Sequence, residues 1–169
     1  VDVDFLIQNG NLDYIFDTDE HILMYKLASD LSCELAPASD TRLHSLGIPM
    51  WWSTVMYFDR SEFSEMFFGV WAHIYDNYVF YQQRYNFSRG TYRTDFCVSI
   101  AAHILGGFGA SQAISEFADT PMRYMSQKDD IVCEYSKMNS MVFLVNDRKK
   151  PWNNIVTKIE STNVHCMNK

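Results

Sequence analysis

The chain has 169 residues, of which 47% are hydrophobic and 15% aromatic, which is typical of one folded domain with a buried core and not of a disordered chain. Its 14 basic and 21 acidic residues give a net charge of -7 without a basic stripe, so binding to nucleic acid or to an anionic membrane surface is not expected. No apolar run is long enough to span a bilayer, and no signal peptide is recognisable.

The four cysteines are scattered and form no Cys-x-x-Cys pair, a spacing that fits neither a zinc ribbon nor a dense disulfide framework. A reducing compartment is therefore expected, and we predict a cytoplasmic protein. The cysteines are Cys33, Cys97, Cys133 and Cys166.

The amino-terminal segment carries two carboxylates, Asp2 and Asp4, next to valines and ahead of the apolar residues 5–7. In an extended chain both acids would point to one side, while the valines anchor the backbone in a core. Like charges so close repel each other unless a cation lies between them, and oxygen ligands suit magnesium or manganese. A second Asp-x-Asp pattern at 17–19 is interpreted instead as the solvated start of a helix.

Hydrophobic spacing predicts four helices in the chain. The clearest begins with Asp59 or Ser61 as its N-cap and runs to about Tyr85, with an aromatic stripe that we interpret as core packing. Another is capped by Thr94 or Asp95 and ends at a glycine pair. The remaining two are short helices at 22–31 and 111–118.

Five segments have the composition of strands, and the last two are expected to pair with each other. Strands that alternate with helices and are followed by hairpins predict an α/β fold with a mixed sheet, here as a single domain over residues 1–169. The expected strands cover 51–58, 131–135, 141–145, 155–159 and 163–167.

The start of the first of these strands combines adjacent tryptophans with hydroxyl side chains. Sugars bind through hydrogen bonds to their hydroxyls and by stacking on aromatic rings. Because neighbouring residues of a strand point in opposite directions, one tryptophan is expected to line a cleft. The predicted substrate-binding residues are Trp51, Trp52, Ser53 and Thr54.

The amino-terminal segment has a characteristic order: an apolar residue, Asp2, a small residue, Asp4, an apolar strand, and then Leu-Asp-x-x-Phe-Asp at 12–17. This order resembles the metal-binding segment of GT-A fold glycosyltransferases, notably glycogenin-like and related bacterial or phage sugar transferases. The resemblance implies a GT-A-like mixed sheet flanked by helices and a Mn²⁺ or Mg²⁺ ion on the two acids. It also implies transfer of a sugar from a nucleotide-diphosphate sugar to an acceptor hydroxyl. A nucleotide-binding half precedes this segment in the family, so the chain is expected to be the carboxyl-terminal portion of such a protein, that is, an incomplete domain.

The carboxyl-terminal tail resembles the segment with which glycogenin-like enzymes close their site. The resemblance implies that His165 is a third metal ligand and that Lys169 contacts the diphosphate, although the spacing is shorter here and the intervening glycine is absent. Imidazole and carboxylate together are an acceptable manganese shell.

The segment that contains Arg93 and Asp95 also resembles the bacterial and phage branch of the family. An acid at a helix start is stabilised by the helix dipole and stays ionised, so Asp95 could accept a proton from an acceptor hydroxyl, orient a sugar or act only as an N-cap. Arg93 is interpreted as a phosphate or sugar contact or as a surface charge.

Two other functions remain open. Two acids and a histidine also suit a metal-dependent phosphoesterase, and a non-catalytic sugar-binding or interaction module is the third alternative. Phosphate-binding P-loops, Gly-x-Ser-x-Gly elbows and dinucleotide fingerprints are absent from the sequence, which excludes the enzyme classes that depend on them.

Overall fold

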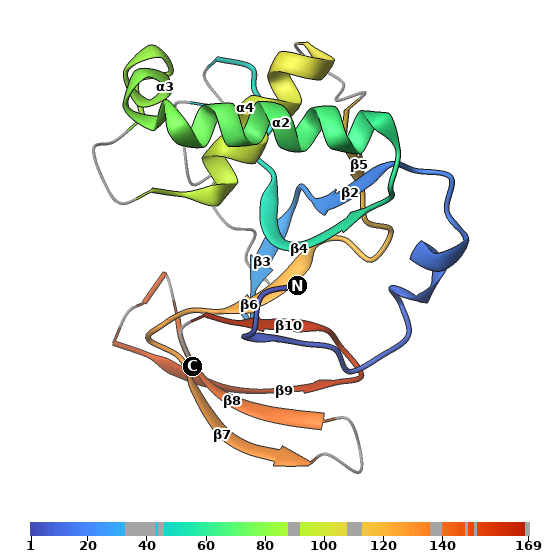
Figure 1. The fold of residues 1–169 in the computed structure, drawn as a ribbon. Helices are drawn as coiled ribbons and strands as arrows, with labels where there is room; N and C mark the ends of the chain where they lie inside the picture. The colour runs from blue at the N-terminus through green and yellow to red at the C-terminus, as the bar shows by residue number, and fades with distance from the viewer. Residues whose placement is uncertain are drawn as a thin grey trace. The chain divides into compact units, whose positions relative to one another are not determined.

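A computed structural model describes residues 1–32, 43, 46–87, 92–107, 113–135, 140–147, 149–150 and 152–167. The described residues form a mixed α/β structure, which confirms the α/β part of the predicted fold class, and their strands form three sheets (Figure 1). They group into two compact units, which are treated separately below. Unit 1 contains Val1–Phe16, Leu27–Ala36 and Ala118–Lys169, and unit 2 contains Asp17–Lys26 and Pro37–Phe117.

Unit 1 is built from two sheets. The first has the strand order β1 (Phe5–Leu6), β10 (Val164–Cys166), β6 (Met122–Met125), β3 (Ala28–Asp30), with β10, β6 and β3 parallel and β1 antiparallel to β10. The second is an antiparallel sheet of β7 (Asp130–Tyr135), β8 (Ser140–Asn146) and β9 (Asn154–Glu160).

The core of unit 1 lies between these two sheets. Alternate residues of each strand point into it, because successive side chains of a strand point to opposite faces of a sheet. Met125 and Val164 of the first sheet meet Met141 and Phe143 of the second, and all four are fully buried. Removing a side chain of this size from water contributes about 1.5–3 kcal/mol.

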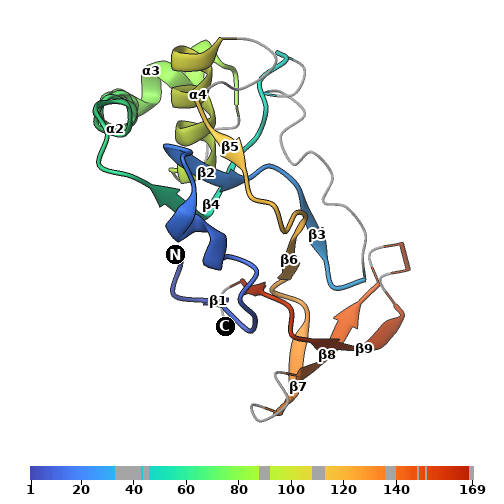
Figure 2. The same cartoon turned by 90° about the vertical axis from the view of Figure 1, so that its right-hand side faces the viewer.

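Unit 2 contains a small sheet covered by helices. Its central strand β2 (Ile22–Tyr25) is antiparallel to β4 (Trp52–Phe58) and parallel to β5 (Ser115–Glu116). Two helices, α2 (Glu62–Asp76) and α4 (Thr94–Gly106), pack on each other above this sheet, and α3 (Tyr78–Arg84) continues from α2 (Figures 1 and 2). Among the described residues, no helix combines the length and apolar character needed to cross a bilayer.

The predicted aromatic helix of unit 2 is confirmed in part. Ser61 is its N-cap and accepts a hydrogen bond from the N–H of Ser64 (3.2 Å), as Ser at this position usually does. The helix breaks at Asn77, so the predicted single element consists of α2 and α3. Its buried stripe, which includes Phe67 and Ile74, packs in the core of unit 2 as expected.

The other predicted helix of unit 2 is also confirmed, but its N-cap is not. Helix α4 begins at Thr94 after Arg93, whose side chain makes no capping hydrogen bond, and Asp95 lies in the first turn. The helix ends at Gly107, whose φ of 76° is a conformation that glycine adopts without steric cost.

Several sequence predictions are wrong. The segment predicted as a helix at 22–31 forms β2 and β3, since all four residues of β2 are buried between β4 and β5 and tertiary pairing overrides local spacing. The described part of 111–118 contains β5 instead of a helix. Asp17 does not start a helix but ends a short 3-10 helix, Asp13–Asp17, and the described residues 18–21 lead into strand β2. Strand β10 pairs with β1 and β6 and not with β9, and β6 was not predicted.

A hydrogen-bonded carboxylate precedes α2. Asp59 Oδ1 accepts hydrogen bonds from Ser61 Oγ (2.6 Å), Ser61 N (3.0 Å) and Ser64 Oγ (2.8 Å), and its Oδ2 lies 2.7 Å from His21 Nδ1. These hydrogen bonds hold the pKa of Asp59 well below its ordinary value of 3.8. The bond from the Ser61 hydroxyl has the largest effect, and the bond from His21 has the next largest.

We therefore predict that Asp59 stabilises the protein above its unfolded pKa near 3.8 and that this contribution disappears as the pH falls towards the lower folded pKa. The difference in urea denaturation midpoint between the wild type and Asp59→Asn should be largest at neutral pH and should shrink as the pH falls below 3.8. Asp17→Asn, at an exposed carboxylate, is the control. A difference that does not change with pH would contradict the prediction.

Candidate functional site

Three predicted metal ligands from opposite ends of the chain meet in unit 1. One possible ligand atom each from Asp2, Asp4 and His165 lies within 4.8 Å of the other two. Within this set, His165 Nε2 lies 3.1 Å from Asp4 Oδ1. The side chains of His165 and Asp4 are 10% and 21% exposed, while Asp2 is exposed. The cluster thus has a partly buried base and an open side.

Strand pairing brings the three residues together. Phe5 of β1 lies opposite His165 of β10, and the N–H of Cys166 donates a hydrogen bond to the carbonyl of Asp4 (2.8 Å). Beyond β1, the side-chain oxygen of Asn163 accepts a hydrogen bond from the N–H of Gln8 (2.9 Å). The amino-terminal segment is therefore held against β10 on both sides of β1.

The route by which the two acids converge differs from the prediction. Asp2 and Asp4 lie in a turn, closed by a hydrogen bond from the N–H of Phe5 to the carbonyl of Asp2 (3.1 Å), and not in an extended strand. Val1 and Val3 are exposed and do not anchor the backbone. Phe5, which is buried, provides the anchor instead.

The distances suit an ion with oxygen and nitrogen ligands. Neighbouring ligands on an octahedral ion with bonds of about 2.1 Å lie about 3.0 Å apart, and opposite ligands about 4.2 Å apart. The Asp4–His165 distance of 3.1 Å matches the first value, and the other two pairs of ligand atoms lie within 4.8 Å. Without an ion, the same Asp4–His165 distance is that of a hydrogen bond.

Two buried polar residues that the sequence analysis missed share a sheet face with His165. Tyr124 of β6 is in register with His165, and Asp30 of β3 is in register with Tyr124. Paired residues on adjacent strands point to the same face, so the three form a polar row. Asp30 Oδ1 accepts hydrogen bonds from the N–H and hydroxyl of Ser32 (2.9 and 2.6 Å). An acid within an apolar segment was the available signal, but the segment was interpreted as a helix.

The predicted catalytic residue Asp95 belongs to unit 2. Its Oδ1 accepts hydrogen bonds from the N–H (3.0 Å) and hydroxyl (2.8 Å) of Ser53, and its Oδ2 accepts one from Arg93 (3.1 Å). The structure thus joins three of the predicted site residues in one cluster. Asp95 links the start of α4 to β4, and Arg93 also lies 5.0 Å from the centre of the Phe96 ring.

The other predicted substrate-binding residues are located as follows. Trp51 and Trp52 are both buried, so neither presents its ring on the surface, and Thr54 is buried as well. Trp51 packs in the core of unit 2, where its backbone N–H donates a hydrogen bond to the Ser99 hydroxyl (2.9 Å) and its indole N–H has no hydrogen-bond acceptor among the described residues. Lys169 lies outside the described residues. The sugar-binding role of this group stays a prediction.

Comparison with known proteins does not assign a family. No family model matches the chain, and searches of curated proteins and of solved structures gave no match.

The Asp95 cluster yields a stability prediction. Asp95→Ala removes the acceptor of two Ser53 donors at a partly buried position and should lower the free energy of unfolding by about 1–3 kcal/mol. Asp95→Asn keeps an oxygen acceptor and should cost less. Urea denaturation measures both, with Asp76→Ala at the exposed end of α2 as the control. Equal losses for Ala and Asn would show that the hydrogen bonds are not the cause.

Proposed function

We propose that the protein is a divalent-metal-dependent glycosyltransferase that uses a nucleotide-diphosphate sugar, with Asp2, Asp4 and His165 as the metal ligands. The observation that supports this proposal is the convergence of two carboxylates and one imidazole from opposite ends of the chain. The segment around Asp2 and Asp4 resembles the metal-binding segment of GT-A glycosyltransferases, and the arrangement of the sheets and helices is proposed to be GT-A-like.

The chemistry of the donor set fits Mn²⁺ or Mg²⁺. Hard oxygen ligands suit both ions, and one imidazole favours manganese. A bound ion would neutralise the negative charge that develops on a leaving diphosphate. On the protein side, the ladder between β1 and β10 holds Asp4 next to His165, and the exposed Asp2 leaves one side of the cluster accessible to a phosphate.

Asp95 is the proposed residue for the acceptor hydroxyl. Its Oδ1 already accepts two hydrogen bonds from Ser53, so Oδ2, which Arg93 contacts, is the oxygen with remaining capacity to orient a hydroxyl or accept its proton. In this proposal Arg93 carries the positive charge that balances Asp95 before the acceptor binds.

Metal binding is the first test. The full chain should bind one Mn²⁺, measured by isothermal titration calorimetry, and Asp4→Ala and His165→Ala should each weaken binding roughly tenfold or more, because each removes one ligand. His73→Ala, which removes an exposed imidazole from α2 outside the cluster, should leave binding unchanged. Unchanged affinity in both cluster variants would refute the metal site.

Sugar transfer is the second test. With Mn²⁺ and a panel of UDP- and GDP-sugars, the protein should release nucleoside diphosphate, and a chelator should abolish the release. Asp4→Ala should lower the rate about 100-fold or more, since a metal contributes several kcal/mol of charge stabilisation.

The two rival functions give different results in the same assay. Phosphate release from a nucleotide or an aryl phosphate, without sugar specificity, would indicate a metal-dependent phosphoesterase on the same three ligands. Sugar binding that survives both chelation and Asp4→Ala, without turnover, would indicate a non-catalytic module.

A further inference from the structure

Unit 2 contains an aromatic pocket that is unrelated to the clusters described above. It is a shallow hollow of about 330 Å³ that is largely open to solvent, and it is lined by Phe68, Trp71, Ala72 and Tyr75 of α2 and by Tyr92. The four α2 residues recur at three- and four-residue spacing, which places them on one face of the helix. Of these residues only Trp71 belongs to the stripe predicted as core packing, and it packs against the core of unit 2 while also lining this pocket.

The rings of the pocket are held in fixed orientations. Phe68 stacks on Trp71 (centroids 5.7 Å apart, planes at 29°), and Phe58 of β4 packs edge-on against Phe68 at 4.8 Å. Tyr75 stands at 80° to Tyr92, with centroids 5.0 Å apart. The pocket thus presents aromatic rings at different angles, and a cation resting on it could contact more than one ring face.

The polar groups of two of these rings, the Trp71 indole N–H and the Tyr92 hydroxyl, already form hydrogen bonds inside the protein. The Trp71 indole N–H donates a hydrogen bond to the Tyr92 hydroxyl (3.0 Å), and that hydroxyl is in turn hydrogen-bonded to Cys97. Burial raises the pKa of Tyr92 to about 12, so its ring stays a neutral phenol at physiological pH. A sugar needs hydrogen-bond partners for its hydroxyls, and these two groups do not offer them.

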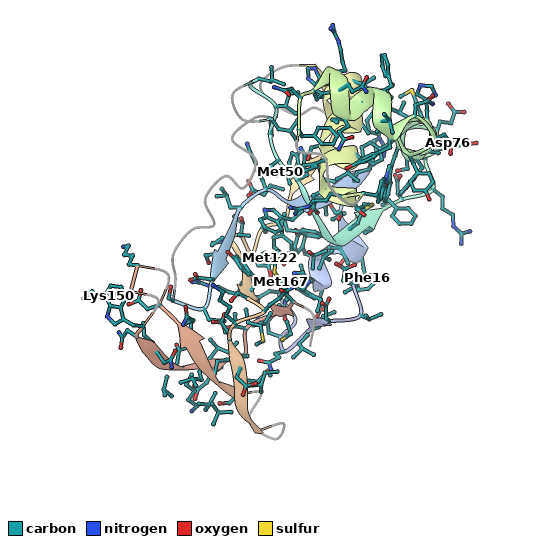
Figure 3. The ribbon with its side chains drawn as sticks, turned by 90° about the vertical axis from the view of Figure 1, so that its left-hand side faces the viewer. Phe16, Met50, Asp76, Met122, Lys150 and Met167 are labelled. Carbon is teal, nitrogen blue, oxygen red and sulfur yellow. The ribbon has the colours of Figure 1, made fainter. Side chains whose placement is uncertain are left out.

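The charge around the pocket is negative. Glu65 precedes Ala72 by seven residues and Asp76 follows it by four, so both exposed carboxylates lie on the Ala72 side of α2. Asp76 lies at the carboxyl end of this helix (Figure 3). Helix α2 contains no lysine or arginine, and Arg93, next to Tyr92 in sequence, is engaged by Asp95 and Phe96.

The small residues of α2 leave this side of the pocket open. Ala72 is exposed, and Gly69 has no atom within 4 Å of the position of an added Cβ, so neither fills the space between Glu65 and Asp76. Glycine inside a helix costs about 1 kcal/mol relative to alanine, and packing does not require it here.

From these features we propose that the pocket binds a small molecule with a methylated ammonium group, such as a choline-type cation. The ring faces attract the cation through their quadrupoles, the methyl groups replace water against the apolar walls, and Glu65 and Asp76 favour the positive charge. This binding is independent of the proposed sugar transfer, because it uses none of the residues assigned to that reaction.

The experiment is an NMR titration of the ¹⁵N-labelled full chain with choline, in which the Trp71 indole N–H signal, assigned with Trp71→Phe, should shift. The neutral isostere 3,3-dimethylbutan-1-ol should bind roughly 5- to 30-fold more weakly, because it lacks the charge. Tyr75→Leu, at a side chain that is 59% exposed and so dispensable for folding, should abolish the shift.

Charge and control variants complete the test. The double variant Glu65→Gln/Asp76→Asn should weaken choline binding roughly 2- to 5-fold, and added salt should reduce that difference. Phe80→Leu, an exposed ring on α3 that does not line the pocket, should have no effect.

Three results would overturn the proposal. Equal affinity for choline and its isostere would make the pocket a site for uncharged apolar groups. A shift with methyl glucoside but not with choline would make it a sugar site. No shift of the Trp71 signal with choline at about 100 mM would exclude binding with a Kd below roughly 100 mM.

Discussion

The short antiparallel ladder between β1 and β10 is the interaction on which the candidate metal site depends. It joins residues almost the whole length of the sequence apart and places the Asp2–Asp4 turn beside His165. Because a two-residue strand forms few hydrogen bonds of its own, burial of Phe5 adds about 1.5–3 kcal/mol to the attachment of this segment. It acts together with the flanking hydrogen bonds from Cys166 to Asp4 and from Gln8 to Asn163.

Successive residues of a strand point to opposite faces, so the first sheet of unit 1 has one face towards the core and places His165 on the other. Val164 and Cys166 point into the core between the sheets, while His165, between them in sequence, points to the opposite face. The same alternation aligns Tyr124 and Asp30 with His165. Buried polar groups on such a face are costly unless they are hydrogen-bonded, and the Asp30–Ser32 bonds meet that requirement.

In unit 2 two carboxylates near the starts of helices each accept several hydrogen bonds. Asp59 organises the residues before α2, and Asp95 connects the first turn of α4 to Ser53 of β4. Each accepts hydrogen bonds from both a serine N–H and its hydroxyl, a combination that fixes a backbone turn or a strand end as well as a side chain. A catalytic use of Asp95 would therefore add to a structural role that its contacts already establish.

The sequence alone determined the α/β class, β4, the aromatic helix with Ser61 as one of its two proposed caps, and α4 with its glycine end, because these depend on local spacing and capping chemistry. Asp2, Asp4 and His165 were predicted to share an ion from a family resemblance, and the pairing of β1 with β10 is what brings them together. Only the tertiary structure decided that 22–31 is two strands, that β10 pairs with β1 and β6, and that Asp30 and Tyr124 join His165. It also decided that Trp51 and Trp52 are buried while Tyr75 borders an open pocket. Strand partners and the exposure of an aromatic ring depend on contacts between residues distant in the chain, and these contacts leave no periodic signal in the sequence.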